Sequence, residues 1–224
     1  DLERVDGTVV PAGSAPVSMR MLGEHQILNA LAATAAALMA GADLAACAAA
    51  LSLAEPLSGQ RMEMRSAGGV LVVNDAYNAN PDSMRLALKT LAHLGRDHRT
   101  IAVLGEMREL GSDSIRLHDE IGRLAVRLNV SHLIVVGAGA APIHQGACLE
   151  GSFGGESEYV ATLDEAMAVL EREVRDGDVV LLKSSRDAGL RTLGPRLLDH
   201  LHQVASDGAT RATGERPDQG DTPA

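Results

Sequence analysis

Hydrogen-bonding side chains are concentrated in one short segment, residues 69–84, which reads GVLVVNDAYNANPDSM. The apolar run at 70–73 predicts a strand. Asn80 followed by Pro81 predicts a helix start, because asparagine caps helices well and proline has no N–H to leave unsatisfied in the first turn. The loop between them holds Asn74, Asp75, Tyr77, Asn78 and Asn80. Ligands of open α/β sheets bind where strands end and helices begin. A capped turn alone would explain Asn80 and Pro81, but the whole loop favours a binding site.

Lysine is rare in this chain, since only Lys89 and Lys183 are lysines among 20 basic residues. Lys89 falls in the body of a predicted helix, where we expect it to be solvated. Lys183 directly follows the apolar run 179–182 and precedes Ser184, Ser185 and Arg186. Such a group at the end of a strand suits recognition of a carboxylate or phosphate. The alternative is an ordinary basic loop over a helix start, and the position favours the functional interpretation.

Two further segments carry charged side chains with alternatives left open. Arg61, in SGQRMEM, could clamp a nucleotide phosphate or pair with an acid such as Glu63. Glu106 and Glu109, in GEMRELG, could contact magnesium or a substrate amine, although solvated acids on a turn are the simpler explanation. The tetrapeptide GAGA that begins at Gly137 predicts a tight turn from strand to helix.

The eight histidines do not form a recognisable metal motif. There is no HExxH, and His200 and His202 are two residues apart on a predicted helix, so they face different directions. His25 and Asn29 are four residues apart and share one helix face. They could contact the edge of a nucleobase or simply cap the helix. The sequence therefore predicts no metal ligands in this chain.

Composition narrows the class of protein further. With 224 residues, of which 46% are hydrophobic, the chain can bury a substantial core. The net charge of -10 argues against a nucleic-acid partner. Two cysteines without a CxxC favour a reducing cytoplasm, and the first ten residues lack the apolar region of a signal peptide. The longest apolar stretch, 27–40, is too short to span a bilayer, so no membrane insertion is expected.

Strand and helix patterns alternate from residue 62 onward. The predicted strands are 62–66, 70–73, 101–104, 132–136, 158–160 and 179–182, and the predicted helices are 81–94, 113–128, 163–174 and 190–204. This alternation predicts an α/β fold, a mostly parallel sheet with helices on both faces. The connection Ala67-Gly68-Gly69 has hairpin spacing, so we expect one antiparallel edge strand.

The region before residue 62 has a different organisation. Short strands are predicted at 8–10 and 17–21, a helix at 26–40 ending at Gly41, and a second helix at 44–50 capped by Asp43. A connector at 56–59 follows. We therefore expect three parts: the end of a preceding domain (1–56), an α/β domain (57–204) and a disordered tail (205–224) without periodicity.

These segments, taken in order, resemble the Mur ligase family. GEHQILNALAATAAALMAG resembles the family's G-x-H-N-x-x-N-x-x-A-A helix, and EPLSGQRMEM resembles its boundary motif, with Gly59, Arg61 and Glu63 in place. Three more segments match: NDAYNANPDSM, LLKSSRDAG, and VLGEMRELGSDSIRLHDEIG with His118 and Gly122. The resemblance covers residues 7–201.

Two positions depart from the family's pattern. Gln26 stands where the family usually has asparagine, and Ser184 replaces a usual glycine. The serine adds a side chain where backbone could approach a ligand.

The resemblance implies three domains: one for a UDP-sugar, one with an ATP phosphate loop, and a Rossmann-like C-terminal one. This chain would hold the end of the second, ATP-binding domain and all of the third. The implied reaction is an ATP-dependent amide ligation in peptidoglycan precursor synthesis. The carboxylate of UDP-N-acetylmuramoyl-tripeptide would take the γ-phosphoryl group, and the amine of D-alanyl-D-alanine would attack the acyl phosphate. A cytoplasmic monomer is expected.

Residue roles follow from the same resemblance. Arg61 would face the ATP phosphates, Asp75 would face the ribose, and His25, Asn29 and Tyr77 would lie around the adenine. The dipeptide side would be formed by Asn78, Asn80, Lys183, Ser185 and Arg186. Arg61 and Lys183 are the predicted catalytic residues. Mg2+ and the phosphate-loop lysine would come from an upstream part, since no GxxxxGK[ST] occurs in these 224 residues.

Two alternatives remain. Another amino-acid ligase of the superfamily, such as a folylpolyglutamate-synthase-like enzyme, would share most of these segments, but the run Tyr-Asn-Ala-Asn-Pro speaks against it. A non-catalytic nucleotide-binding α/β module would explain the missing phosphate loop, but it would leave residues 1–56 without a purpose.

Overall fold

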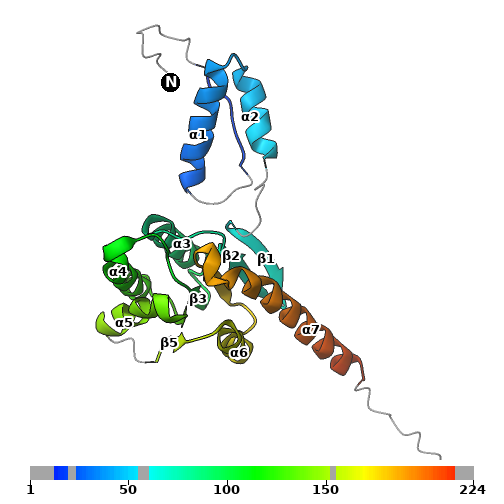
Figure 1. Ribbon diagram of the computed structural model, residues 1–224. Coiled ribbons are helices and arrows are strands. Elements are labelled where there is room, and N and C mark those ends of the chain that lie inside the picture. Colours follow the sequence, from blue (N-terminus) through cyan, green and yellow to red (C-terminus); the bar gives the residue numbers. More distant parts are fainter. Residues whose placement is uncertain (1–12, 20–23, 55–60, 152–154, 215–224) are drawn as a thin grey trace, which may run out of the picture. The chain divides into compact units, whose positions relative to one another are not determined.

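The computed structural model describes residues 13–19, 24–54, 61–151 and 155–214. Within these ranges, the side chains of residues 24–25 and 208–214 are not described. The chain forms two compact units, residues 1–59 and 60–224, which are described separately (Figure 1). No helix in the described ranges combines the length and apolar character needed to cross a bilayer.

The first unit contains two helices, α1 (Glu24–Met39) and α2 (Leu44–Leu53). Gly41, with φ of +93°, lies in the turn between them. Asp43 caps α2 as predicted, because its carboxylate accepts a hydrogen bond from Ala46 N at 3.1 Å. The predicted strand at 17–21 is wrong for residues 17–19, where the chain is irregular and Ser18 N donates to the Ser52 hydroxyl instead of a partner strand. The predicted strand 8–10 and connector 56–59 lie outside the described residues.

The second unit is built on a six-stranded sheet in the order β1-β2-β6-β3-β4-β5. Its strands are β1 (Glu63–Ala67), β2 (Val70–Asn74), β3 (Thr100–Leu104), β4 (His132–Val136), β5 (Ser157–Val160) and β6 (Val179–Lys183). Strand β1 pairs antiparallel with β2, and the other pairs are parallel. Gly68 and Gly69 make the hairpin turn with φ of +54° and +74°, which glycine adopts at low cost. The predicted antiparallel edge strand is confirmed.

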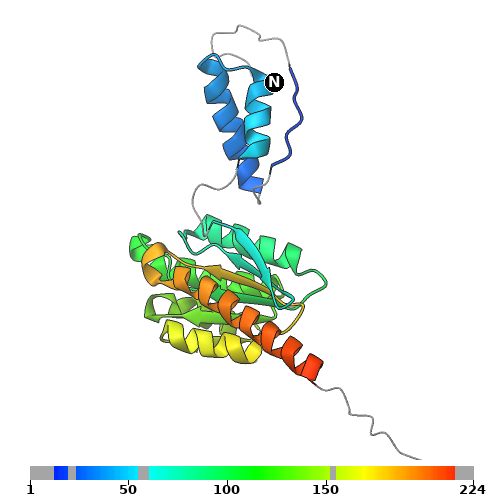
Figure 2. The ribbon, with the colours of Figure 1, turned by 90° about the vertical axis from the view of Figure 1, so that its right-hand side faces the viewer.

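Helices cover both faces of this sheet (Figure 2). Helices α3 (Pro81–Leu94), α4 (Ser114–Arg127) and α5 (Ala141–Leu149) bury one core, and α6 (Leu163–Glu173) and α7 (Leu193–Gly214) bury the other. Neighbouring strand residues point to opposite faces, so Val72 joins the α6/α7 core and Val73 joins the α3/α4/α5 core. The predicted α/β fold class is therefore confirmed.

Helix α5 is absent from the sequence-based prediction, which expects only a tight turn near Gly137. The turn exists as a 3-10 segment, Ala138–Ala140, and α5 follows it directly. Two glycines let α4 and α5 approach closely: a Cβ on Gly122 would lie 1.8 Å from Ile143 O, and a Cβ on Gly146 would lie 2.2 Å from Asp119 O. Glycine in a helix normally weakens a helix prediction, and here it is required by the packing.

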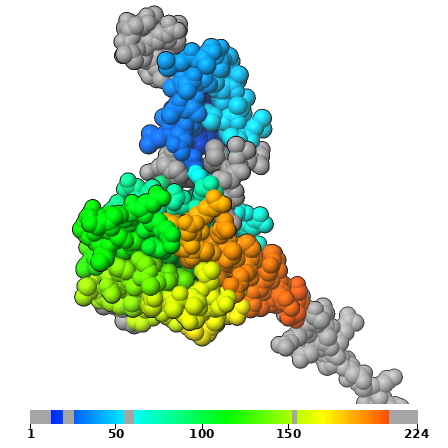
Figure 3. Space-filling model, in the orientation of Figure 1, coloured from blue at the N-terminus to red at the C-terminus, as the bar shows by residue number. Residues whose placement is uncertain are grey.

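Helix α7 differs from its prediction at both ends. It begins at Leu193, after two 3-10 segments (Arg186–Ala188 and Leu190–Thr192), and it continues to Gly214. The predicted disordered tail from residue 205 is therefore wrong for residues 205–214. A helix already anchored by the buried Leu193, Leu197 and Leu201 can propagate one residue at a time. The space-filling view shows α7 extending from the body of the second unit (Figure 3).

Candidate active site at the carboxyl edge of the sheet

Strand β6 lies between β2 and β3, so the carboxyl ends of these three strands meet at one edge. Asn74 of β2 pairs with Leu182, and Leu104 of β3 pairs with Lys183. The ladder continues into the loops, because Asp75 N donates to Leu182 O at 2.8 Å and Gly105 N donates to Lys183 O at 2.9 Å. The loops after β2, β3 and β6 therefore start from fixed positions.

Lys183 is a buried cation at this edge, with 1% of its surface exposed. Its Nζ lies 2.5 Å from Asp75 Oδ2 and donates to the Asn78 carbonyl oxygen at 3.0 Å. The other oxygen of Asp75 accepts a hydrogen bond from Met62 N at 3.0 Å. Burial lowers the pKa of the Lys183 ammonium, and the Asp75 carboxylate partly offsets this effect. The structure thus shows something that neither sequence-based alternative for Lys183 includes: an internal partner, Asp75, that holds the charge in place.

Arg61 lies beside this pair. Its guanidinium carbon is 4.4 Å from the centre of the Tyr77 ring, which is a cation–π distance. Its positive charge also contributes to the lowered pKa of Lys183. Glu63, which the sequence offers as one alternative partner of Arg61, forms an ion pair with Arg65 at 2.7 Å. The structure brings Arg61, Asp75, Tyr77 and Lys183 into one group.

Ser185 connects two loops of the site. Its hydroxyl donates to Ala79 O at 3.3 Å and accepts from Arg108 N at 2.9 Å, and its own N–H donates to Glu106 O at 2.9 Å. Arg186, the next residue, is exposed at the start of a 3-10 segment. The predicted dipeptide residue Ser185 therefore fixes the loop after β3 to the loop after β2.

Ser184, which departs from the family's pattern, is fully buried and donates to Ser185 O at 3.0 Å. Gly105 makes room for it, since a Cβ on Gly105 would lie 2.8 Å from the Ser184 Cβ. The added side chain is thus directed into the protein.

The predicted residues of the loop after β2 have mixed roles. Asn80 caps α3 in a capping box with Ser83, accepting from Ser83 N at 2.8 Å and donating through its own N–H to Ser83 Oγ at 3.0 Å. Asn78 is exposed, and its Oδ1 accepts from Ala79 N at 2.9 Å. Asn78 also supplies the carbonyl that holds Lys183.

His25 and Asn29 belong to the first unit. Asn29 is exposed and donates to Gln26 Oε1 at 3.2 Å on the same helix, while the His25 side chain lies outside the described residues. Their predicted contact with adenine stays a prediction.

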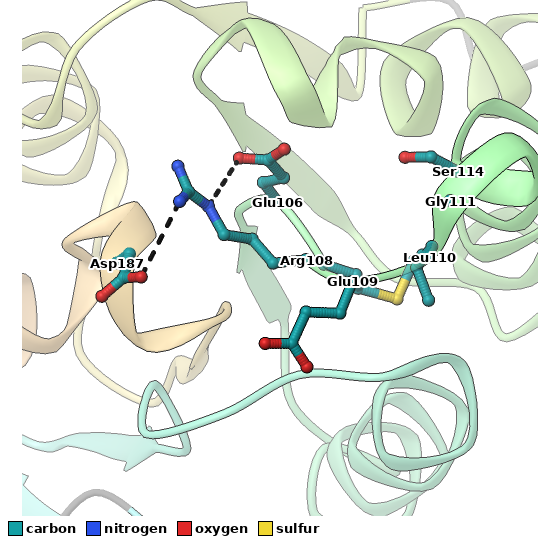
Figure 4. Close-up of a pocket in the computed structure, with 8 residues that line it drawn as sticks. Glu106, Arg108, Glu109, Leu110, Gly111, Ser114 and Asp187 are labelled. Carbon is teal, nitrogen blue, oxygen red and sulfur yellow. Dashed lines mark ion pairs between the residues drawn. The ribbon is translucent and has the colours of Figure 1, made fainter.

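A pocket of about 450 Å³ lies next to this site, in the loop after β3 (Figure 4). It is lined by Glu106, Met107, Arg108, Glu109, Leu110, Gly111, Ser114 and Asp187. The Arg108 guanidinium lies between two carboxylates, with 3.4 Å from its Nε to Glu106 Oε2 and 3.7 Å from its Nη1 to Asp187 Oδ2. Sequence reasoning considered the two glutamates but missed Arg108 and Asp187. Both residues could have been found, because Arg108 lies in GEMRELG and Asp187 lies in LLKSSRDAG, two segments that the sequence already singles out.

A buried histidine supports this loop. Met107 N donates to His118 Nε2 at 2.8 Å, so that nitrogen carries no proton. The proton is then on Nδ1, which donates to Ser114 O at 2.7 Å. His118 therefore acts as a fixed connector between the loop and the start of α4.

No group of three or more His, Cys, Asp or Glu side chains within the described ranges is placed to hold a metal ion.

The chain is similar to known proteins over most of its length. Residues 60–186 match the family described as "Mur ligase, glutamate ligase domain". The UDP-N-acetylmuramoyl-tripeptide–D-alanyl-D-alanine ligase of Mycobacterium tuberculosis (strain H37Rv) is 48% identical over 202 residues, covering 82% of this chain and 40% of that protein. The ligase of the same name from Escherichia coli (strain K12) is 30% identical over 180 residues, covering 80% of this chain and 38% of that protein.

A crystal structure of MurF from Acinetobacter baumannii superposes with a TM-score of 0.75 at 31% identity, covering 84% of this chain and 41% of that one. The chain thus spans about 40% of the length of the curated relatives it matches. Because residues 60–186 match the family's domain and the fold matches that of a solved relative, the chain belongs to the Mur ligase family.

Proposed function

We propose that this chain is the C-terminal part of an ATP-dependent ligase that joins D-alanyl-D-alanine to UDP-N-acetylmuramoyl-tripeptide. The observation that carries the proposal is the buried ammonium of Lys183, held by Asp75 and the Asn78 carbonyl in the segment NDAYNAN. The 48% identity to a ligase with this name over most of the chain supports the same activity.

The charges of the site suit a reaction between two anionic partners. Formation of an acyl phosphate brings a carboxylate and a phosphoryl group together, and cations positioned in advance lower the cost of that approach. Lys183 is held in one position by Asp75 and the Asn78 carbonyl, and Asp75 offsets part of its charge, so the pair acts as a preorganised dipole toward a nearby anion. Arg61 is exposed beside it and is free to turn its guanidinium from the Tyr77 ring toward a phosphate. We assign these two residues the roles of stabilising the acyl phosphate and the nucleotide phosphates.

After the ammonium group of the dipeptide has lost one proton to solvent, its free amine attacks the acyl carbon. The amide C–N bond forms, the C–O bond to the phosphate breaks, and the attacking nitrogen gives up a second proton, which leaves with the phosphate. Holding both reactants at one edge supplies the orientation that this step needs. Mg2+ would neutralise phosphate charge in such a reaction. The described residues offer no group of three or more side chains that could hold it, so we propose that its ligands lie in the upstream part. The predicted cytoplasmic location and monomeric state stay predictions.

The test is phosphate release by the intact enzyme that contains this chain. We expect turnover only when ATP, UDP-N-acetylmuramoyl-tripeptide and D-alanyl-D-alanine are all present, with the amide product identified by mass spectrometry. Turnover with glutamate and a folate acceptor instead would favour the folylpolyglutamate-synthase-like alternative. Nucleotide binding without turnover on any acceptor would favour the non-catalytic module.

A further inference from the structure

A cysteine, a histidine and a serine meet between α5 and β5, which lie next to each other in the second unit (Figure 1). The serine, Ser157, is the first residue of β5. Strand β5 runs parallel to β4, β3 and β6, and Lys183 is the last residue of β6. The three side chains therefore lie at the amino edge of the sheet, opposite the Lys183 loop. Their chemistry does not depend on the proposed function.

The cysteine of this group, Cys148, is exposed, whereas the chain's other cysteine, Cys47, is buried on α2. Cys148 Sγ lies 3.6 Å from His144 Nε2, one helical turn back on α5. His144 Nδ1 in turn lies 2.7 Å from the Ser157 hydroxyl. A nucleophile with a base in reach, and a third group that orients the base, is the arrangement that activates cysteine thiols.

The hydrogen bonds of His144 suit the transfer of a proton from the thiol. When Nδ1–H donates to the Ser157 hydroxyl oxygen, Nε2 carries no proton and can accept one from the sulfur. After the transfer both ring nitrogens are donors, Nδ1 still to Ser157 and Nε2 to the thiolate. The Tyr159 ring, whose centre is 6.5 Å from that of His144, packs beside the imidazole. The ring therefore keeps its partners in both protonation states.

The local charges make the imidazole necessary for a thiolate at this position. Cys148 lies in the last turn of α5, where the free carbonyl groups of a helix disfavour an anion. A proton on His144 places a positive charge next to the sulfur and offsets this effect. Glu150, two residues further on, adds little repulsion, because Arg127 and Arg123 pair with its carboxylate at 2.6 and 3.0 Å.

We propose that Cys148 is a modification site that forms a mixed disulfide with a small-molecule disulfide, with His144 as its general base and Ser157 as the positioning residue of that base. The thiol proton moves to His144 Nε2, and the sulfur attacks one sulfur of the disulfide. A new S–S bond forms while the old one breaks, and the leaving thiolate takes the proton from His144. One protein thiol and one disulfide thus give one mixed disulfide and one free thiol, without a further oxidant.

The test treats the intact enzyme at pH 7 with hydroxyethyl disulfide, which is small and uncharged, and follows each cysteine-containing peptide by mass spectrometry. Cys148 should react about tenfold or more faster than the buried Cys47, and dithiothreitol should reverse the change. His144→Gln can still accept a hydrogen bond but cannot hold the proton, so it should slow the reaction of Cys148 about fivefold or more. Ser157→Ala should slow it about twofold or more, because the ring loses its orientation.

The pH dependence separates a base from a mere contact. Between pH 6.5 and 7.5 the rate in His144→Gln should rise nearly tenfold, as for a thiol that reacts only through its thiolate. In wild type, where the imidazole accepts the proton, the rise should be about threefold or less. His202→Gln is the matched control, because it makes the same replacement at an exposed position of α7, on the other face of the sheet, and should react as wild type does.

Circular dichroism shows whether each variant is folded. If His144→Gln does not fold, Ser157→Ala decides, and a rate equal to that of wild type would overturn the proposal. With folded His144→Gln, equal rates in the variant and wild type, or the same pH dependence in both, would overturn it as well. So would a Cys148 that reacts no faster than Cys47.

Discussion

Lys183 Nζ and Asp75 Oδ2 lie 2.5 Å apart, although 108 residues separate them in the chain. Lys183 is the last residue of β6, and Asp75 follows the last residue of the adjacent parallel strand β2, so the sheet order itself brings them together. The pair is nearly inaccessible to water, with side-chain exposures of 2% and 14%. A cation in this setting keeps one position, which is what a group that acts on a developing anion requires.

Replacing Lys183 by alanine in the intact enzyme should lower kcat/KM for D-alanyl-D-alanine by tenfold or more, on the order of 1.4 kcal/mol in transition-state binding. The loss follows from removing the fixed cation and leaving Asp75 without its partner. Steady-state phosphate release measures the effect. Lys89→Ala is the control, because Lys89 is exposed on α3 and is the chain's other lysine. Equal kinetics of the two variants would remove Lys183 from the site.

Much of the second unit could be predicted from local signals. The Asn80-Pro81 pair predicted the start of α3 correctly, and the Gly68-Gly69 pair predicted the hairpin, because both depend on residues adjacent in sequence. Helix α5 could not be predicted in the same way. Its nine residues are stabilised by close packing on α4 through Gly122 and Gly146, and that contact is not visible in a local pattern.

The candidate site was predictable by residue type but not by arrangement. Lys183 and Asp75 stand out in the sequence, yet their pairing depends on β6 lying between β2 and β3, and strand order is not encoded in spacing. The same order places Asp187 opposite Arg108. The role of Ser185 as a connector of backbone groups likewise depends on two loops that are distant in sequence.

The 224-residue chain alone is expected to show no ligase turnover. It contains no GxxxxGK[ST] segment, whose backbone amides and lysine hold the phosphates of ATP in enzymes that use such a loop. Phosphate release with all three substrates, compared with a heat-inactivated sample, measures this. Turnover above that background would mean that these residues bind and activate ATP by themselves.

Gly122→Ala should destabilise the second unit, although alanine normally favours a helix by about 1 kcal/mol over glycine. The added Cβ would lie 1.8 Å from Ile143 O, so α4 and α5 must separate, at a cost of roughly 1–3 kcal/mol or more. Urea denaturation measures the net change. Gln145→Ala, at an exposed position of α5, should change stability little. A stabilising effect of Gly122→Ala would show that the two helices can move apart freely.

His118→Phe should destabilise the loop after β3. The phenyl ring removes the acceptor of Met107 N, and an unsatisfied buried N–H costs about 1–3 kcal/mol. His118→Gln, which can offer an oxygen near the position of Nε2, should recover part of the loss. Hydrogen exchange at Met107 N is the direct readout, and it should be fast in the Phe variant and slower in the Gln variant. Unchanged protection in both would contradict the role of His118.

Acidification should destabilise the chain through His132, the first residue of β4. Burial lowers the pKa of His132, and its Nε2 has no hydrogen-bond partner. The unfolded imidazole binds its proton near pH 6.5, so below that pH the unfolded state holds more protons than the folded one. The stability contribution is therefore complete above about pH 6.5 and decreases as the pH falls toward the lowered pKa of the folded state.

Thermal unfolding at pH 7.5 and pH 5.5 separates this contribution from that of other groups. His132→Phe cannot titrate, so its Tm should fall less between the two pH values than that of wild type. His93→Phe makes the same replacement at an exposed position of α3 and should follow wild type. Glu158 Oε2 lies 3.9 Å from His132 Nε2, and a shift of this carboxylate toward the ring would let it form an ion pair with the protonated imidazole. In that case wild type would lose no more stability than His132→Phe, and burial would not be the dominant effect at this position.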